Sequence, residues 1–234
     1  MAANSRTLAD VQGTVLSLHK ISAIKETISF YDTWSELYEQ DVKLLDYRAP
    51  LLASMSLADV MLEDRDQALV LDVACGTGLV AMQLQKLGFC NFHGVDGSER
   101  MLQLAESKSV YQTLQKCILH AGSLPLSSDT YDAVLIVGAL SEGQVPYTII
   151  RELHRVTKLG GFVCMTTRMN VSNHLYKTQL QAVIEEMEQK GLWVKVKVQE
   201  IKHWEKASSV HETKQDSTYI PGIIFIYQKS KDHE

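Results

Sequence analysis

Leu71-Asp72-Val73-Ala74-Cys75-Gly76-Thr77-Gly78 is the most informative stretch of this chain. The apolar run at residues 68–74 predicts a buried strand, and residues 79–87 predict a helix that stops at Gly88. Glycines between a strand and a helix allow a tight turn and a close approach of the backbone to a bound molecule. The stretch therefore predicts a strand, a glycine-rich loop and a helix, which open a parallel α/β sheet.

The segments after this loop alternate between short apolar runs and amphipathic stretches. Strands are expected at residues 91–95, 117–120, 133–137 and 162–167, the last of them after a turn at Gly160-Gly161. Helices are expected at residues 98–107, with Ser98 as N-cap, at 146–156 and at 174–189. This alternation predicts parallel strands joined by right-handed crossovers.

The end of the chain breaks the alternation. Residues 193–204 and 222–227 both indicate strands, and only a polar loop at residues 207–218 separates them. No helix fits in that loop, so the two strands are predicted to pair in antiparallel fashion. An ordinary nicotinamide-binding Rossmann domain is parallel, so this hairpin favours a different α/β architecture.

The N-terminal part of the chain is predicted to be helical. Val11, Val15 and Leu18 recur at helical spacing, and so do the apolar residues around Trp34. Residues 1–65 are therefore expected to form a helical lid or extension, and residues 66–234 a Rossmann-like core. The 234 residues suit one structural domain with a decorated terminus.

The glycine loop has two interpretations. The run from Gly76 to Ala81 matches the G-x-G-x-x-G/A dinucleotide fingerprint, and Asp96 follows Gly76 by 20 residues. Asp72, however, lies in the strand just ahead of the loop, where its carboxylate would repel a pyrophosphate. The same carboxylate would attract the ammonium and sulfonium groups of S-adenosylmethionine. Asp72 and the C-terminal hairpin together favour S-adenosylmethionine over a nicotinamide dinucleotide.

Four segments resemble the class I S-adenosylmethionine-dependent methyltransferases. Residues 71–78 resemble the first motif of that family, and residues 94–98 with Met101 and Leu102 resemble its ribose and adenine motif. Residues 124–134 resemble its "LP-F … FD" segment, and residues 30–38 resemble the lid of the ubiquinone-methyltransferase-like branch. The resemblance implies an α/β fold with a Rossmann-like seven-stranded methyltransferase sheet. That sheet would be mostly parallel, with an antiparallel C-terminal hairpin and helices on both faces.

The resemblance also implies roles for single residues toward S-adenosylmethionine and its product S-adenosylhomocysteine. Asp96 would accept both ribose hydroxyls, or alternatively act only as an acid at a helix N-terminus. Asp72 would hold the methionine ammonium, cap the loop amides, or do both. Tyr31, Trp34, Tyr38 and Arg48 would close over the methionine end, with Arg48 on its carboxylate, or alternatively form a helical lid packed by its own aromatic side chains. Met101 would pack on the adenine or only in the core. The implied cofactor-binding residues are Tyr31, Trp34, Tyr38, Arg48, Asp72, Ala74, Cys75, Gly76, Gly78, Asp96, Gly97, Met101, Gly122, Ser123, Leu124, Val137 and Gly138.

The composition of the chain argues against several classes of binding partner. The net charge of −5 does not suggest a nucleic-acid surface, and no apolar run approaches the ~20 residues that span a bilayer. The four cysteines show no metal-binding spacing, so no metal is expected. The N-terminus lacks the apolar stretch of a signal peptide. We therefore expect a monomer in the cytoplasm, with the nucleus as an alternative.

The methyl acceptor is not marked in the sequence. Many relatives have paired histidines after the fourth strand, where this chain has residues 139–144 without a histidine. No catalytic residue and no general base can be named from the sequence. A small-molecule acceptor is the first hypothesis. A protein acceptor, or S-adenosylmethionine binding without catalysis in a protein that acts through partners, are the alternatives.

Overall fold

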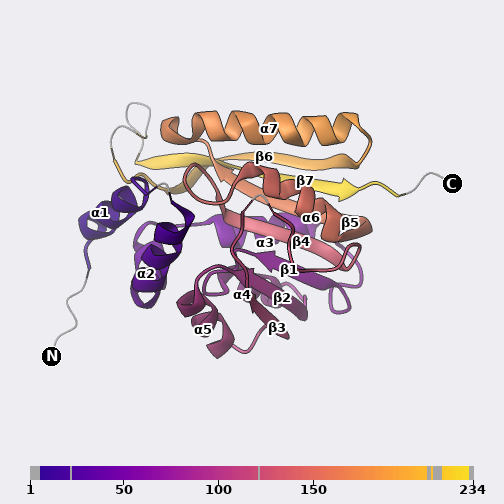
Figure 1. Ribbon diagram of the computed structural model, residues 1–234, viewed down its shortest axis with the longest axis horizontal. Coiled ribbons are helices and arrows are strands. Elements are labelled where there is room, and N and C mark those ends of the chain that lie inside the picture. The colour runs from indigo at the N-terminus through magenta and orange to yellow at the C-terminus, as the bar shows by residue number, and fades with distance from the viewer. Residues whose placement is uncertain (1–5, 22, 121, 210–211, 213–217, 232–234) are drawn as a thin grey trace.

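Seven strands form one sheet at the centre of the computed structural model, which describes residues 6–21, 23–120, 122–209, 212 and 218–231 (Figure 1). The strands are β1 (Leu69–Val73), β2 (Asn91–Asp96), β3 (Thr113–Lys116), β4 (Tyr131–Leu140), β5 (Thr157–Arg168), β6 (Trp193–Lys206) and β7 (Tyr219–Lys229). Their order across the sheet is β3-β2-β1-β4-β5-β7-β6.

The antiparallel C-terminal pair is confirmed. Strands β1 to β5 run parallel to one another, and β7 runs antiparallel to both of its neighbours, β5 and β6. The inner strand β7 is buried along most of its length, while the edge strand β6 exposes charged side chains that discourage further pairing. The expected polar loop at residues 207–218 lies partly outside the described residues, at 210–211 and 213–217.

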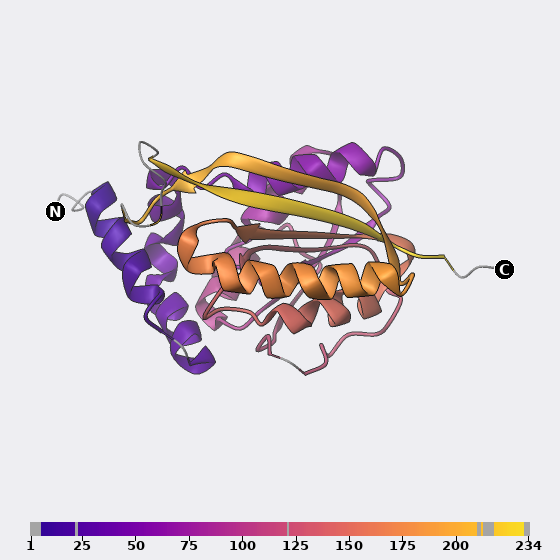
Figure 2. The same cartoon turned by 90° about the horizontal axis from the view of Figure 1, so that it is seen from above.

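Helices cover both faces of the sheet, as expected (Figure 2). Helices α3 (Ala49–Val60) and α4 (Leu79–Lys86) pack through Leu57 and Leu84 on one face, where both side chains are fully buried. Helices α6 (Ile150–Val156) and α7 (His174–Gln189) pack on the other face. Burial of each such side chain contributes about 1.5–3 kcal/mol, so the two apolar layers stabilise the sheet from both sides.

Two N-terminal helices lie at one end of the sheet, α1 (Leu8–Leu18) and α2 (Ile24–Leu44) (Figures 1 and 2). A capping box between Thr7 and Asp10 starts α1. The segment after α2 is tied to β6, because the Arg48 amide donates to the Trp204 carbonyl and the Lys206 amide to the Leu45 carbonyl. These hydrogen bonds thus connect the N-terminal helices to the C-terminal hairpin.

The strand predicted at residues 117–120 is wrong. The third strand, β3, ends at Lys116, and the Cys117 amide makes the last bond of this edge, to the Asp96 carbonyl. Strand β3 is exposed or only half-buried along its length, so it lacks the apolar run by which buried strands are predicted. The apolar residues that follow it include Leu119, which lies against the cavity described below.

Other boundaries shift by smaller amounts. Gly160 and Gly161 lie inside β5 instead of in a turn ahead of it, and β5 changes register against β4 in this region. The helix predicted at residues 146–156 is a 3-10 turn at Tyr147–Ile149 followed by α6, and a second 3-10 turn, Val171–Asn173, precedes α7. In the described part of the chain, no helix has the length and apolarity needed to cross a membrane.

Candidate functional site

The loop between β1 and α4 is a strained turn with one open side. Ala74, Gly76 and Gly78 have φ angles of 56°, 54° and 89°, all in the left-handed region. Ala74 carries a Cβ, so its backbone stores strain there. A Cβ added at Gly76 would meet no atom within 4 Å, whereas one at Gly78 would lie 3.0 Å from the Tyr111 ring. The backbone at Gly76 therefore leaves space for a ligand.

Asp96 closes this loop from the end of β2. Its Oδ2 accepts the Gly76 amide and its Oδ1 accepts the Ser98 amide, each at 2.8 Å. Burial raises the pKa of Asp96, and the amides of Ser98, Gly76 and Gly97 oppose that rise. Each carboxylate oxygen keeps a further acceptor position, and the side chain lines a cavity. Asp96 can therefore accept both hydroxyl hydrogens of a bound diol.

Asp72 lies on the other side of the loop and is buried, with 1% of its surface exposed. The Tyr111 hydroxyl donates to its Oδ2 at 2.7 Å, while its Oδ1 has no partner among the described residues. Burial raises the pKa of Asp72 to about 7, which the Tyr111 hydrogen bond opposes. Asp72 does not line the cavity, so its visible role is to anchor Tyr111 under the loop.

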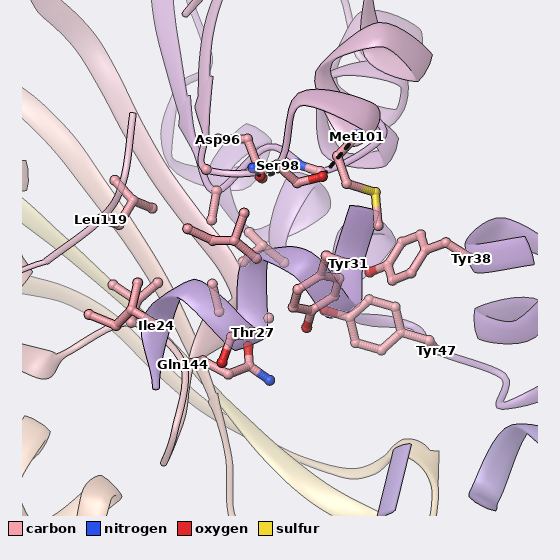
Figure 3. A pocket seen from close by; sticks show the side chains of 18 residues that line it. Ile24, Thr27, Tyr31, Tyr38, Tyr47, Asp96, Ser98, Met101, Leu119 and Gln144 are labelled. Carbon is pink, nitrogen blue, oxygen red and sulfur yellow. Dashed lines mark hydrogen bonds between the residues drawn. The ribbon is translucent and has the colours of Figure 1, made fainter. Parts of the chain in front are cut away.

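A cavity lies between the strand ends and α2 (Figure 3). Gly76, Asp96 and Met101 line it from the sheet side. The opposite wall comes from α2 and from the segment that follows it, through Ile24, Thr27, Ile28, Tyr31, Tyr38 and Tyr47. The cavity therefore has a polar edge at Asp96 and an aromatic wall opposite the strands.

Helix α2 is fastened to helix α5 (Glu99–Ser107), which begins next to Asp96. Oδ1 of Asp32, on α2, accepts the Ser98 hydroxyl at 2.6 Å and the Arg100 amide at 3.2 Å. The ammonium of Lys108 bonds to Glu39 on α2 and donates to the Thr77 carbonyl in the glycine loop. These contacts hold the aromatic wall over the strand ends.

Gly138 forms the floor beneath Tyr47. Its φ of 79° and the register shift between Ile136 and Leu140 mark a bulge in β4. A Cβ at Gly138 would lie 1.9 Å from the Tyr47 hydroxyl oxygen, so only glycine admits this tyrosine. The Gly138 amide donates to the Thr166 hydroxyl at 2.9 Å. The bulge therefore brings Tyr47 against the end of β4.

A second cavity adjoins the first and is called the side chamber below. The two share Tyr31, Tyr38, Tyr47, Gly138 and Gln144. The side chamber extends toward the ends of β5 and β6, where Ser141, Arg168, Trp204 and Glu205 line it.

The structure brings many of the residues expected from the sequence together. The residues that line the first cavity are Tyr31, Tyr38, Ala74, Gly76, Asp96, Gly97, Met101, Val137 and Gly138. Trp34 lines the side chamber, next to Tyr31 with ring centroids 5.9 Å apart. Arg48, Asp72, Cys75, Gly78, Gly122, Ser123 and Leu124 line neither cavity.

Two of these positions have other partners. The Arg48 guanidinium donates to the His203 carbonyl at 3.2 Å, which ties the start of α3 to β6. The Leu124 amide donates to the Glu152 carboxylate at 2.8 Å, and Arg155 donates to the Leu124 carbonyl. Arg48 and the segment at 122–124 therefore fasten elements to one another in this structure, and Leu119 reaches the cavity instead.

Several cavity residues have no signal in the sequence. Ile24, Thr27 and Ile28 read as ordinary helical positions, and Gln144 lies in a polar loop. Tyr47 comes after α2, three residues beyond its end at Leu44. Only the way α2 lies across the strand ends brings these side chains to the cavity.

Several known proteins resemble this chain in sequence. The sequence model of a methyltransferase domain matches residues 71–165. The human protein named Methyltransferase-like protein 27 is 50% identical over 187 residues, which are 80% of this chain and 76% of that protein. A demethylmenaquinone methyltransferase of Halalkalibacterium halodurans is 38% identical over 103 residues, 42% of each protein.

Solved structures share the fold at low identity. A putative methyltransferase of Haloferax volcanii, solved in complex with the Trm112 methyltransferase activator, superposes with a TM-score of 0.61 at 15% identity. The match covers 87% of this chain and 97% of that one. A Thermotoga maritima structure described as a S-adenosylmethionine-dependent methyltransferase, possible histamine N-methyltransferase, has a TM-score of 0.55 at 20% identity. That match covers 86% of this chain and 98% of that one.

Proposed function

We propose that this chain, which belongs to the class I S-adenosylmethionine-dependent methyltransferases, methylates a small molecule. The observation that carries the proposal is the aromatic wall of α2, which covers the strand ends and lines both the first cavity and the side chamber. A protein acceptor needs an open groove for a polypeptide. The net charge of −5 also gives no support to a nucleic-acid acceptor.

The first cavity fits the nucleoside of S-adenosylmethionine. Asp96 would accept the two ribose hydroxyls, and the open side of Gly76 would let the backbone approach the donor. Met101 and Leu119 offer apolar surface for the adenine. Asp72 does not reach this cavity, so we assign it the support of the loop and not the methionine ammonium.

The bound donor supplies a methyl group already activated by a positively charged sulfur. The chain therefore has to orient the acceptor and keep water out, because alignment of the reacting atoms accounts for much of the rate in such displacements. Tyr31, Tyr38 and Tyr47 form a wall suited to excluding water. Burial raises the pKa of all three hydroxyls well above 10, so they stay neutral donors near pH 7.

Calorimetry and an acceptor screen test the proposal. S-adenosylhomocysteine should bind with micromolar affinity, and no binding would overturn the proposed donor site. Labelled methyl groups should then be transferred into the small-molecule fraction of a cell extract. Transfer into the protein fraction alone would assign a protein acceptor, and binding without any transfer would favour a binding protein without catalysis.

A further inference from the structure

One carboxylate that lines the side chamber forms no hydrogen bond with the described residues. Glu205 lies near the end of β6, after a bulge between Ile201 and Glu205 in the pairing with β7. Its side chain lines the chamber. Within the described part of the chain, no group donates a hydrogen bond to this carboxylate. No cationic nitrogen there lies within 4.0 Å of its oxygens, the limit for an ion pair. An acceptor-only group without donors in a cavity wall is suited to a guest that carries donors.

The other charged groups of this region already have partners. The Arg168 guanidinium bonds to His19 Nε2 at 2.8 Å and donates to the Ser141 hydroxyl at 3.3 Å. The Glu212 carboxylate accepts from Asn170 and from the backbone and hydroxyl of Ser208. Burial lowers the pKa of His19 to about 4, so this imidazole is neutral.

The charges of the chamber therefore do not balance. This region holds one cation, Arg168, and two carboxyls, Glu205 and Glu212, so ionised Glu205 and Glu212 together leave one negative charge over. Aromatic rings form much of the remaining wall, among them Tyr31, Trp34 and Tyr38. The faces of such rings attract cations. A carboxylate beside aromatic faces is an arrangement that binds an ammonium group.

We propose that the side chamber is the acceptor site and that Glu205 binds an amine and takes its proton, which makes the acceptor a nitrogen nucleophile. This inference rests on the proposed methyltransferase function. The chamber adjoins the donor cavity, because both are lined by Tyr31, Tyr38 and Tyr47. Figure 3 shows these three side chains close to one another at the donor cavity. An amine held at Glu205 would therefore lie in a space that adjoins the donor cavity.

The transfer balances with no further reactant. The bound ammonium passes one proton to the Glu205 carboxylate, and the freed lone pair on nitrogen forms the new bond to the methyl carbon. The carbon–sulfur bond breaks and its electron pair stays on sulfur. The product is a methylated ammonium ion, and the proton leaves Glu205 for solvent.

The ionisation of Glu205 suits this role. Burial raises the pKa of its carboxyl to about 7, Glu212 raises it further, and Arg168 opposes the rise. The carboxyl therefore gains and gives up a proton near neutral pH. The titratable and charged groups that surround it are His19, Tyr31, Tyr38, Tyr47, Arg168 and Glu212.

A panel of matched small molecules tests the proposal. Phenethylamine, 2-phenylethanol and 3-phenylpropionic acid share an aromatic ring and a short chain, and differ in whether they carry an amine, an alcohol or an acid. Calorimetry is run on the protein saturated with S-adenosylhomocysteine, for the parent, for Glu205→Gln and for Glu200→Gln. Glu200 is an exposed carboxylate on the same strand and serves as the control.

The amine should bind the parent and the Glu200→Gln variant, and Glu205→Gln should weaken its binding by roughly tenfold or more, as expected for a hydrogen bond to a charged group. Binding to the parent should strengthen from about pH 6 to about pH 8, as the carboxyl ionises while an alkyl amine stays protonated. Glu205→Gln should abolish this pH dependence and leave the affinity for S-adenosylhomocysteine unchanged.

Four outcomes would overturn the acceptor assignment. They are binding of the alcohol or the acid in preference to the amine, binding of none of the three, equal amine affinity in Glu205→Gln, and a pH dependence that survives the substitution. Intact binding of S-adenosylhomocysteine in the same samples separates any of these from a failure of the proposed methyltransferase function.

Discussion

Asp96 is the residue on which the proposed donor site depends. Its carboxylate accepts two backbone amides and faces the cavity with its remaining acceptor positions. Asp96→Asn keeps the shape but replaces one acceptor oxygen by a donor. We expect the dissociation constant of S-adenosylhomocysteine to rise by about tenfold or more, since hydrogen bonds to charged groups contribute about 1.5–3 kcal/mol. Calorimetry measures this, with the exposed Glu99→Gln as control, and equal affinities for Asp96→Asn and the parent would refute the ribose role.

The need for glycine at position 138 can be tested by a single substitution. Gly138→Ala places a Cβ against the Tyr47 hydroxyl and forces a left-handed φ, so we expect a loss of about 1–3 kcal/mol in unfolding free energy. Gly13 lies in α1 with ordinary φ and no atom near its missing Cβ. Gly13→Ala should therefore stabilise the protein by roughly 0.5–1 kcal/mol. Urea unfolding measures both, and a neutral Gly138→Ala would show that Tyr47 moves away freely.

The sequence predicts single residues well only where local pattern and chemistry coincide. Gly76 and Asp96 follow from a glycine loop and a strand end, and both line the cavity. Tyr47 and Glu205 do not follow from any local pattern, because only the packing of α2 and β6 over the strand ends brings them there. A contact between residues so far apart in the chain leaves no trace in a single sequence.

The contact between α2 and α5 holds the aromatic wall of α2 next to the strand ends. Asp32 supplies this contact, because it accepts from Ser98 and from the Arg100 amide at the start of α5. Asp32→Ala should cost about 1 kcal/mol, as the loss of a helix cap does, and should speed hydrogen exchange in α2. Glu36→Ala, at an exposed position of the same helix, is the control. If exchange in α2 is the same in both variants, the contact does not hold the helix in place.

The strands buried in the sheet follow from the sequence, whereas the edge strand β3 does not. Strands β1 and β4 show continuous apolar runs because they are covered on both faces. The edge strand β3 lacks this signal, so its position was predicted one segment too late. The hairpin of β6 and β7 was predicted from what separates the two strands, since no helix fits between them.

The N-terminal helices and the C-terminal hairpin contact each other next to the ends of the strands. Gln12 of α1 donates to the Ala207 carbonyl at 2.7 Å, and Lys206 bonds to Leu45 at the end of α2. The first two helices and the last hairpin thus enclose the side chamber together. The chamber exists only in the complete fold, and so does the burial that raises the pKa values of Asp72 and Glu205 to about 7.

These buried carboxyls give the stability of the molecule a predictable dependence on pH. The pKa values of Asp72 and Glu205 are raised to about 7 by burial, whereas unfolded Asp and Glu titrate near about 4. Between about pH 4 and about pH 7 the unfolded chain releases these protons and the folded protein keeps them, so rising pH favours unfolding. The variants Asp72→Asn and Glu205→Gln each remove one of these carboxyls, so they do not undergo its part of this loss of stability as pH rises.

We therefore expect the unfolding free energy of each variant, minus that of the parent, to increase from about pH 4 to about pH 7 and to level off above that. Glu186→Gln is the control of opposite sign, because Lys190 and Arg151 lower the pKa of the Glu186 carboxyl. The Glu186 carboxylate stabilises the folded protein above its unfolded pKa. The unfolding free energy of the control, minus that of the parent, should therefore decrease as pH rises through about 4. Urea unfolding at a series of pH values measures all three differences. Curves for Asp72→Asn and Glu205→Gln that stay parallel to the parent's across this range would mean that both carboxyls are ionised in the folded protein, and that burial does not govern them.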